Sequence, residues 1–360
     1  MASYPSLQSS YPWTKTPLIA SAPMLRIAMA PLAVAVSRAG GLGFLAGGFE
    51  VSNLEKDLEH ASRLIKESAP PILGKDKDVL PIGVGFLNWG ADRETALAAL
   101  KKYTPCAVWL FAPANQPDDL VPWVEQIRTA TCGKTKIWVQ IGNVAEAIAV
   151  AGTLKPDVLV VQGSDAGGHG LAQSASIVTL LPEVHDSLAQ LGHSQIPLLA
   201  AGGIADGRGV AASLMLGAAG VVMGTRFLAC SEATIARGYQ SEILRTSDGG
   251  VSTVRSTVYD RARGILDWPG RYNGRGVINQ TYIDSVERGM SDDEIRDLYL
   301  KEMEKGDDGW GPQGRMTTYA GTGVGLVKEI LTAEEIINKT LSETNEVLRR
   351  NSTGLLSGRH

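Results

Sequence analysis

A single histidine stands among glycines in residues 163–170, which read GSDAGGHG. Imidazole takes up or releases a proton near neutral pH, so His169 could act as a general base toward an acidic carbon. Its glycine neighbours offer the ring little local packing. From this segment alone, a histidine that only braces a turn is equally compatible. Asp165 could orient the ring, but a short acidic side chain in such a stretch more often caps a turn, so we do not assign it a catalytic role.

Two glycine-containing segments indicate a phosphate site. Residues 201–204 read AGGI and residues 223–227 read MGTRF. Glycines let backbone N–H groups approach phosphate oxygens closely, a following helix adds partial positive charge, and the Thr225 hydroxyl can donate a further hydrogen bond. Glycines also form tight turns that bind nothing. Two such segments after the last two strands of a barrel nevertheless favour phosphate binding.

The elements that position these segments form a regular pattern. Short apolar runs alternate with helix-like segments from about residue 18 to residue 230, which predicts parallel strands joined by helices. Eight strands close a barrel, whereas an open doubly wound sheet would carry GxGxxG after its first strand, where this chain has Ala22-Pro23-Met24. We therefore predict an α/β fold, a (β/α)8 TIM barrel. The predicted strands are residues 18–22, 42–46, 82–86, 107–111, 136–141, 158–162, 197–201 and 220–223.

The alternation stops between residues 238 and 316, where Gly, Arg, Asp and aromatic residues become frequent. We interpret this stretch as an irregular, mainly helical insertion beside the barrel mouth. The predicted domains are thus a barrel formed by residues 1–237 and 317–360, and an insertion formed by residues 238–316. A chain of 360 residues with 44% hydrophobic composition can bury the core of such a barrel.

Composition excludes several classes of function. A net charge of −4 offers no positive field for nucleic acid. The three cysteines, Cys106, Cys132 and Cys230, are far apart and lack metal-ligand spacing, so neither disulfides nor a metal site are predicted. No apolar run reaches the roughly 18 residues of a membrane span, and no signal peptide pattern opens the chain. We predict a cytoplasmic protein that binds neither nucleic acid nor membrane, and its oligomeric state stays open.

Taken in order, these motifs resemble the nitronate monooxygenase family, formerly called 2-nitropropane dioxygenases. Each motif is weak alone, and the set is specific. The resemblance covers about residues 18–340, and residues 259–264, 268–269 and 272–275 are similar to the insertion of fungal-type members. The segments that carry it are residues 22–24, 39–43, 164–170, 201–204, 223–227 and 321–325.

The resemblance implies a non-covalently bound FMN and the oxidation of alkyl nitronates, and also of nitroalkanes, by molecular oxygen to a carbonyl compound and nitrite. His169 falls on the family's catalytic histidine, which deprotonates neutral nitroalkanes and interacts with anionic nitronates. The residues that the resemblance assigns to FMN are Pro23, Met24, Gly85, Gln140, Gln162, Gly167, Gly168, Ala201, Gly202, Gly203, Met223, Gly224 and Thr225.

Two positions depart from the family pattern. Arg26 follows the first strand where many relatives have a glycine-containing turn; it could assist an acidic substrate, although a surface ion pair is the favoured interpretation. Some relatives have Asn where this chain has Gly85, so a flavin contact there would come from the backbone.

Three other functions stay open. The first is an FMN-dependent enoyl-thioester reductase of the same superfamily, against which the fungal-like insertion argues. The second is a barrel that binds FMN without turnover, since a fold does not settle function. The third is an oxidase or monooxygenase that acts on a larger substrate.

Overall fold

The barrel is closed. The computed structural model describes residues 7–68, 71, 72, 74 and 76–356. Its eight-stranded parallel sheet has the order β1-β9-β8-β6-β5-β4-β3-β2. At the open edge, a parallel bridge joins Ala20 to Leu42, and the N–H of Leu42 bonds to the carbonyl of Ile19 at 3.0 Å. The predicted (β/α)8 barrel is therefore confirmed.

All eight predicted strands are present, and their ends differ from the predicted ones by two residues at most. Most of their residues are buried, because the barrel interior covers one face and the helices cover the other. This double burial explains why the strands are continuous apolar runs instead of alternating patterns. The strands are β1 Leu18–Ser21, β2 Phe44–Gly48, β3 Leu80–Leu87, β4 Pro105–Phe111, β5 Lys136–Ile141, β6 Val158–Gln162, β8 Leu198–Ala201 and β9 Gly220–Met223.

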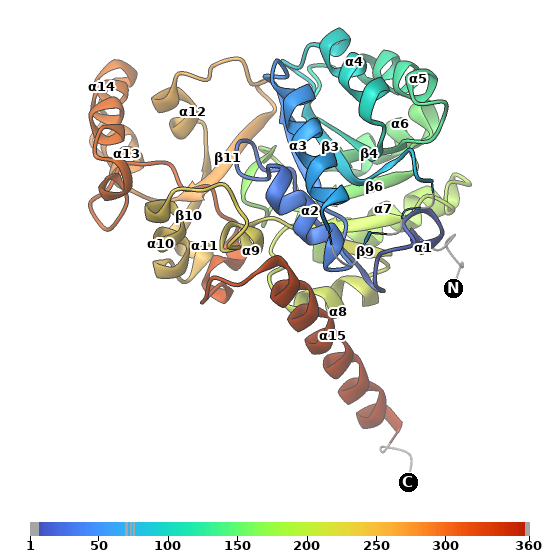
Figure 1. Ribbon diagram of the computed structural model, residues 1–360. Helices are drawn as coiled ribbons and strands as arrows, with labels where there is room; N and C mark the ends of the chain where they lie inside the picture. The colour runs from blue at the N-terminus through green and yellow to red at the C-terminus, as the bar shows by residue number, and fades with distance from the viewer. Residues whose placement is uncertain (1–6, 69–70, 73, 75, 357–360) are drawn as a thin grey trace.

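Helices surround the barrel (Figure 1). Several begin at a side-chain cap: Asp92 accepts from the N–H of Thr95 at 2.8 Å, and Asn143 from that of Glu146 at 2.8 Å. The last helix, α15 (Ala333–Leu356), packs on α8, and its C-terminal part projects away from the barrel. The others are α1 Leu7–Ser10, α2 Ala30–Arg38, α3 Leu54–Lys66, α4 Arg93–Tyr103, α5 Val121–Ala130, α6 Val144–Leu154, α7 Ile177–Gln190 and α8 Gly207–Met215.

Aromatic side chains fill the barrel interior. Phe44 lies edge-on to Trp109, with ring centroids 5.2 Å apart, and 4.9 Å from Trp138. The indole N–H of Trp138 donates to the hydroxyl of Tyr11 at 2.7 Å. Burial raises the pKa of Tyr11 well above its ordinary value, so this hydroxyl stays neutral. The segment after α1 thus closes one end of the barrel with an apolar plug.

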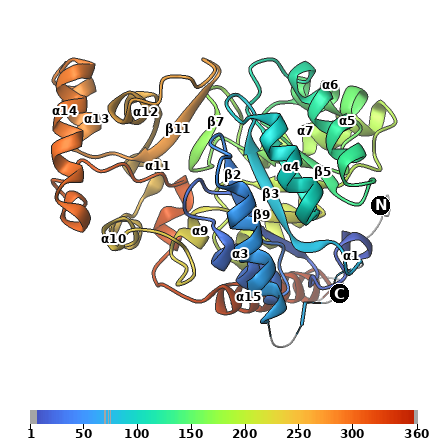
Figure 2. The ribbon, with the colours of Figure 1, turned by 45° about the horizontal axis from the view of Figure 1, so that its top comes forward.

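Three strands that the sequence did not predict form a second sheet; one lies between β6 and β8, and the other two lie after β9. A three-stranded antiparallel sheet joins β10 (Thr253–Ser256), β11 (Tyr272–Val277) and β7 (Gly168–Leu171), of which β7 carries His169. This sheet lies between the barrel and the outer helices (Figure 2). The strands were missed because GHGL, TVRS and YNGRGV lack apolar alternation. The outer helices are α10 Arg237–Arg245, α11 Gly249–Ser252, α12 Val258–Arg263, α13 Gln280–Val286 and α14 Asp292–Met303.

The domain boundaries at residues 238 and 316 stay a prediction, and the first six and last four residues of the predicted barrel domain lie outside the described part of the chain. Cys106, Cys132 and Cys230 are all free thiols. In the described ranges, no helix combines the length and the apolar character needed to cross a membrane.

Candidate active site

A pocket of about 390 Å³ opens where the barrel strands end. Gln162 ends β6 and Ala201 ends β8, and Gly224 directly follows β9; all three line the pocket. Arg263 and Trp268 form part of its wall from the side of the predicted insertion. Active sites of (β/α)8 enzymes lie at this carboxyl end of the strands, and the volume falls in the range of small-molecule sites.

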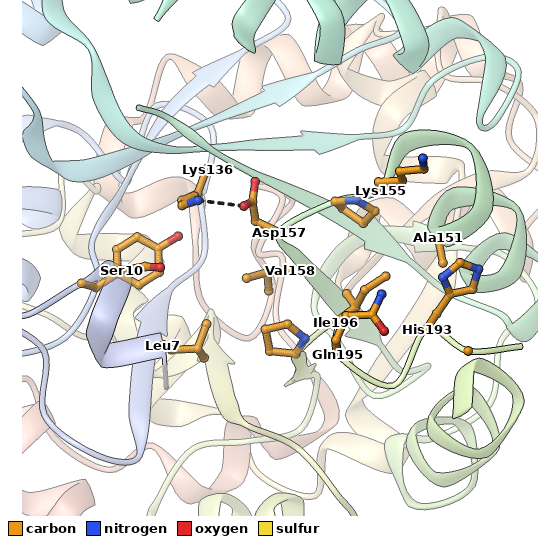
Figure 3. Close-up of a pocket in the computed structure, with 14 residues that line it drawn as sticks. Leu7, Ser10, Lys136, Ala151, Lys155, Asp157, Val158, His193, Gln195 and Ile196 are labelled. Atoms are coloured by element: carbon orange, nitrogen blue, oxygen red, sulfur yellow. Dashed lines mark hydrogen bonds and ion pairs between the residues drawn. The ribbon is translucent and has the colours of Figure 1, made fainter. Parts of the chain in front are cut away.

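A second cavity, of about 510 Å³, lies at the opposite end of the barrel (Figure 3). It is lined by Lys136, the first residue of β5, by Val158, the first of β6, and by Pro197, which directly precedes β8. Lys136 Nζ pairs there with Asp157 Oδ1 at 3.0 Å. This end of a barrel contributes to stability and not to catalysis. We therefore place the candidate active site in the first pocket.

His169 and all but one of the residues predicted to contact the cofactor line the first pocket. The exception is Met223, which is fully buried in the hydrophobic core. Successive side chains of a strand point to opposite faces, and its neighbour Val222 is the one that reaches the pocket. The residues that line it as predicted are Pro23, Met24, Gly85, Gln140, Gln162, Gly167, Gly168, Ala201, Gly202, Gly203, Gly224 and Thr225.

The two glycine segments form a cradle with little side-chain bulk. Gly202 and Gly203 have φ angles of 113° and 74°, a region that side chains rarely adopt. A Cβ on Gly224 would meet only the Cβ of Ala22 within 4 Å, at 3.7 Å, so Gly224 faces open space. The hydroxyl of Thr225 accepts from the N–H of Gly321 at 3.0 Å, which leaves its hydrogen for a ligand oxygen. The helix that follows, α9 (Thr225–Leu228), is a single turn and adds little dipole.

Two glutamines line the pocket with different partners. Gln140 Oε1 accepts from the indole N–H of Trp109 at 3.1 Å, while its buried Nε2 has no partner within the described residues. Gln162 Nε2 donates to the carbonyl of His169 at 3.0 Å. A buried donor without a partner costs about 1–3 kcal/mol. The amide of Gln140 is therefore suited to donate to a bound molecule.

The ring of His169 is held by residues far away in the sequence. The indole of Trp268 stacks on it, with centroids 3.7 Å apart and planes 2° from parallel. Tyr319 meets it edge-on at 5.2 Å. His169 Nε2 lies 3.0 and 2.9 Å from the two carboxylate oxygens of Asp260. These packing partners all come from outside residues 163–170, whose glycines offer the ring little local packing.

Asp260 is itself enclosed. It is 4% exposed, and its Oδ1 also accepts a hydrogen bond from the hydroxyl of Tyr319 at 2.8 Å. Burial raises the pKa of Tyr319 well above its ordinary value, and the negative charge of Asp260 raises it further, so the hydroxyl stays a donor. The guanidinium of Arg263 lies 5.7 Å from the centre of the Tyr319 ring.

Sequence reasoning gave no role to Asp260, Trp268 or Tyr319. Asp260 and Trp268 lie in segments that carried the resemblance, so their positions were noted without a function. Asp165 does not contact the histidine: its Oδ1 accepts from the hydroxyl of Thr322 at 3.0 Å. The turn-capping role expected for Asp165 stays a prediction.

Two arginines donate hydrogen bonds to backbone carbonyls of residues 163–170. Arg255 donates to the carbonyls of Ala166 and Asn273, both at 2.8 Å, and Arg275 donates to that of Ser164 at 3.2 Å. Burial, together with the nearby charge of Arg275, lowers the pKa of Arg255 to about 10. Both side chains therefore fix the loop that precedes β7.

Arg26 lies at the rim of the pocket in a tight turn, with a φ of 61°. Its side chain is exposed, and it forms no ion pair with any carboxylate in the part of the chain that the structure describes. The surface ion pair that we favoured from the sequence is thus not present, and the cation stays beside the pocket.

A family model and two fungal relatives that match nearly the whole chain carry the same name. A family model described as nitronate monooxygenase matches residues 101–343. The nitronate monooxygenase npaC of Metarhizium robertsii is 47% identical over 346 residues, or 95% of each chain. The nitronate monooxygenase of Neurospora crassa is 36% identical over 97% of this chain and 94% of its own. A solved nitroalkane oxidase from Streptomyces ansochromogenes superposes with a TM-score of 0.72 over 96% of this chain and 99% of that one; at 22% identity, this likeness concerns the fold.

Proposed function

The chain belongs to the nitronate monooxygenase family, whose members are flavin-dependent oxidoreductases, and from that premise we propose that it binds FMN and oxidises alkyl nitronates with molecular oxygen. The products are a carbonyl compound and nitrite. Family membership, which the motifs indicated, is confirmed. The observation that carries the proposal is the position of His169 on the wall of a pocket that also contains both glycine segments.

The residues of the pocket fit FMN. Gly224 leaves room for the phosphate, Gly202 and Gly203 line the same pocket without side chains, and the hydroxyl of Thr225 has a hydrogen to donate to it. The unpartnered amide of Gln140 offers a donor to the polar edge of the ring system. When bound, FMN would accept electrons from the substrate and pass them to oxygen.

His169 supplies the proton chemistry. A nitronate is already an anion, so a protonated imidazole attracts its oxygens and holds it in the pocket. A neutral nitroalkane must first lose a proton from carbon, and the unprotonated imidazole takes it. The aromatic side chains of Trp268 and Phe111 line the same pocket, and apolar surroundings of this kind strengthen both interactions by lowering the local dielectric constant.

The proposal is tested by recording the visible spectrum of the purified protein and then adding propionate 3-nitronate without oxygen. Bleaching of a bound flavin by the nitronate supports the proposal. A flavin that ignores the nitronate but is bleached by NADH or NADPH favours the enoyl-thioester reductase. A flavin protein that turns over no nitro compound favours the non-catalytic barrel. No flavin, even after reconstitution with FMN, would overturn the cofactor assignment.

Gly224→Ala tests the phosphate cradle. The added methyl group would project into the space proposed for the phosphate, while its only protein neighbour is at an ordinary distance of 3.7 Å. We expect the Kd for FMN to rise about tenfold, equivalent to about 1.4 kcal/mol, with little change in the stability of the protein without cofactor. Gly152→Ala in α6, where a Cβ meets nothing within 4 Å, is the matched control. An unchanged Kd in Gly224→Ala would contradict the cradle.

A further inference from the structure

We propose that Asp260 is a positioning residue for His169: it holds a hydrogen on Nε2 and thereby makes Nδ1 the atom that takes the substrate's proton. The inference rests on the proposed function, in which His169 is the base. Sequence reasoning considered only Asp165 for this role, and Asp165 instead bonds to Thr322.

The geometry fixes the tautomer. Nε2 of His169 lies 2.9 and 3.0 Å from the two oxygens of Asp260. An ionised carboxylate only accepts hydrogen bonds, so Nε2 must donate. A neutral imidazole carries a single N–H, and Nδ1 then has the lone pair. Within the described residues, Nδ1 has no hydrogen-bond partner, so it is the nitrogen left for a substrate.

The surroundings hold both the ring and the carboxylate in place. Trp268 covers one face of the imidazole in a parallel stack, and Tyr319 meets its edge. The hydroxyl of Tyr319 also donates to Asp260 Oδ1 at 2.8 Å, which holds the carboxylate. A half-turn of the ring would bring a carbon toward Asp260 and lose the hydrogen bond from Nε2. Rotation is therefore disfavoured, and one nitrogen faces Asp260 throughout.

The proton transfer balances without any further reactant. The α C–H bond of the nitroalkane breaks, its electron pair stays on the substrate as the nitronate, and the proton moves to Nδ1. The resulting imidazolium still donates its Nε2 hydrogen to Asp260, and the negative charge of the carboxylate stabilises the positive ring. A substrate that arrives as the nitronate needs no such transfer. Asp260 should therefore matter far more for neutral nitroalkanes than for nitronates.

Asp260→Asn tests whether Asp260 sets the tautomer of His169. The amide Nδ2 of asparagine would donate to Nε2, while Oδ1 would still accept from Tyr319. Nδ1 would then carry the hydrogen and could not take a proton. We expect kcat/KM for a neutral nitroalkane to fall by about 10³- to 10⁴-fold, the scale known for a catalytic histidine locked in the wrong tautomer. We expect kcat/KM for the corresponding nitronate to change by less than about tenfold.

A second experiment determines the tautomer without any substrate. The five histidines of the protein are labelled with ¹⁵N, and the NMR spectrum is recorded at about pH 8.5. The signals of His169 are those lost in His169→Asn. We expect an Nε2–H tautomer in the wild-type protein and an Nδ1–H tautomer in Asp260→Asn. Tyr319→Phe, which keeps the carboxylate but removes one of its donors, should retain the Nε2–H tautomer and lose only about tenfold in nitroalkane kcat/KM.

The chain contains a matched control. His185 Nδ1 and Asp186 Oδ1 also lie 3.0 Å apart, but this pair is outside both cavities and its aspartate is largely exposed. Asp186→Asn should change neither substrate's kinetics nor the signals of His169. An Nε2–H tautomer that persists in Asp260→Asn, or an equal loss with both substrates, overturns the proposal. If the wild-type protein oxidises neither substrate, the proposed function fails, while the tautomer signals still decide the role of Asp260.

Discussion

Replacing His169 with asparagine is expected to lower kcat/KM for neutral nitroalkanes by about 10⁴-fold, at least as much as Asp260→Asn, and to leave kcat/KM for nitronates within about tenfold of the wild-type value. Asparagine has no basic nitrogen, so the α proton of the nitroalkane loses the base that we propose for it. The nitronate has already lost that proton and forfeits only an attraction for its oxygens. Steady-state oxygen consumption with one nitroalkane and its own nitronate gives both values.

The two substrate forms should also differ in their pH dependence. Turnover of the nitroalkane should rise with pH because it needs the unprotonated imidazole, whereas binding of the nitronate should weaken because it benefits from the protonated one. His193→Asn, which alters a histidine in the cavity at the opposite end of the barrel, is the control and should change neither profile. An equal loss of both activities in His169→Asn would refute the division of roles.

Gly43→Ala should lower the free energy of unfolding by more than about 4 kcal/mol, a loss that single substitutions cause only through severe packing defects. A Cβ on Gly43 would lie 1.8 Å from the carbonyl oxygen of Ala33 and 2.6 Å from its carbonyl carbon. Both atoms belong to the backbone of α2, so no side-chain movement can relieve the overlap. The segment between α2 and β2 would have to move, and with it the bridge at Leu42 that closes the barrel.

Urea unfolding monitored by circular dichroism measures this loss. Gly250→Ala is the control, because a Cβ there meets nothing within 4 Å, and it should change the free energy of unfolding by no more than about 0.5 kcal/mol. A loss below 1 kcal/mol in Gly43→Ala would show that α2 adjusts easily and that the close contact is not required. Close packing would then not explain why residues 39–43 match the family pattern.

The barrel itself could be predicted because its signals are local. Each strand is buried on both faces and is therefore a short apolar run, and each run lies between helix-like segments. The rule that active-site loops follow the strands then placed both glycine segments at one end of the barrel. Met223 failed to reach the pocket because strand alternation turns it outward, and that alternation was already present in the sequence.

The surroundings of His169 were decided by the tertiary structure alone. Asp260 lies 91 positions from His169 in the sequence, and Tyr319 lies 59 positions beyond Asp260. They meet because β7 pairs with β11 and brings the histidine beside α12, although neither strand has an apolar pattern that could predict the pairing. The sequence by itself determined the barrel, its glycine cradle and the candidate base. Which nitrogen of that base faces the substrate depends on contacts between distant segments, and only the folded chain brings those segments together.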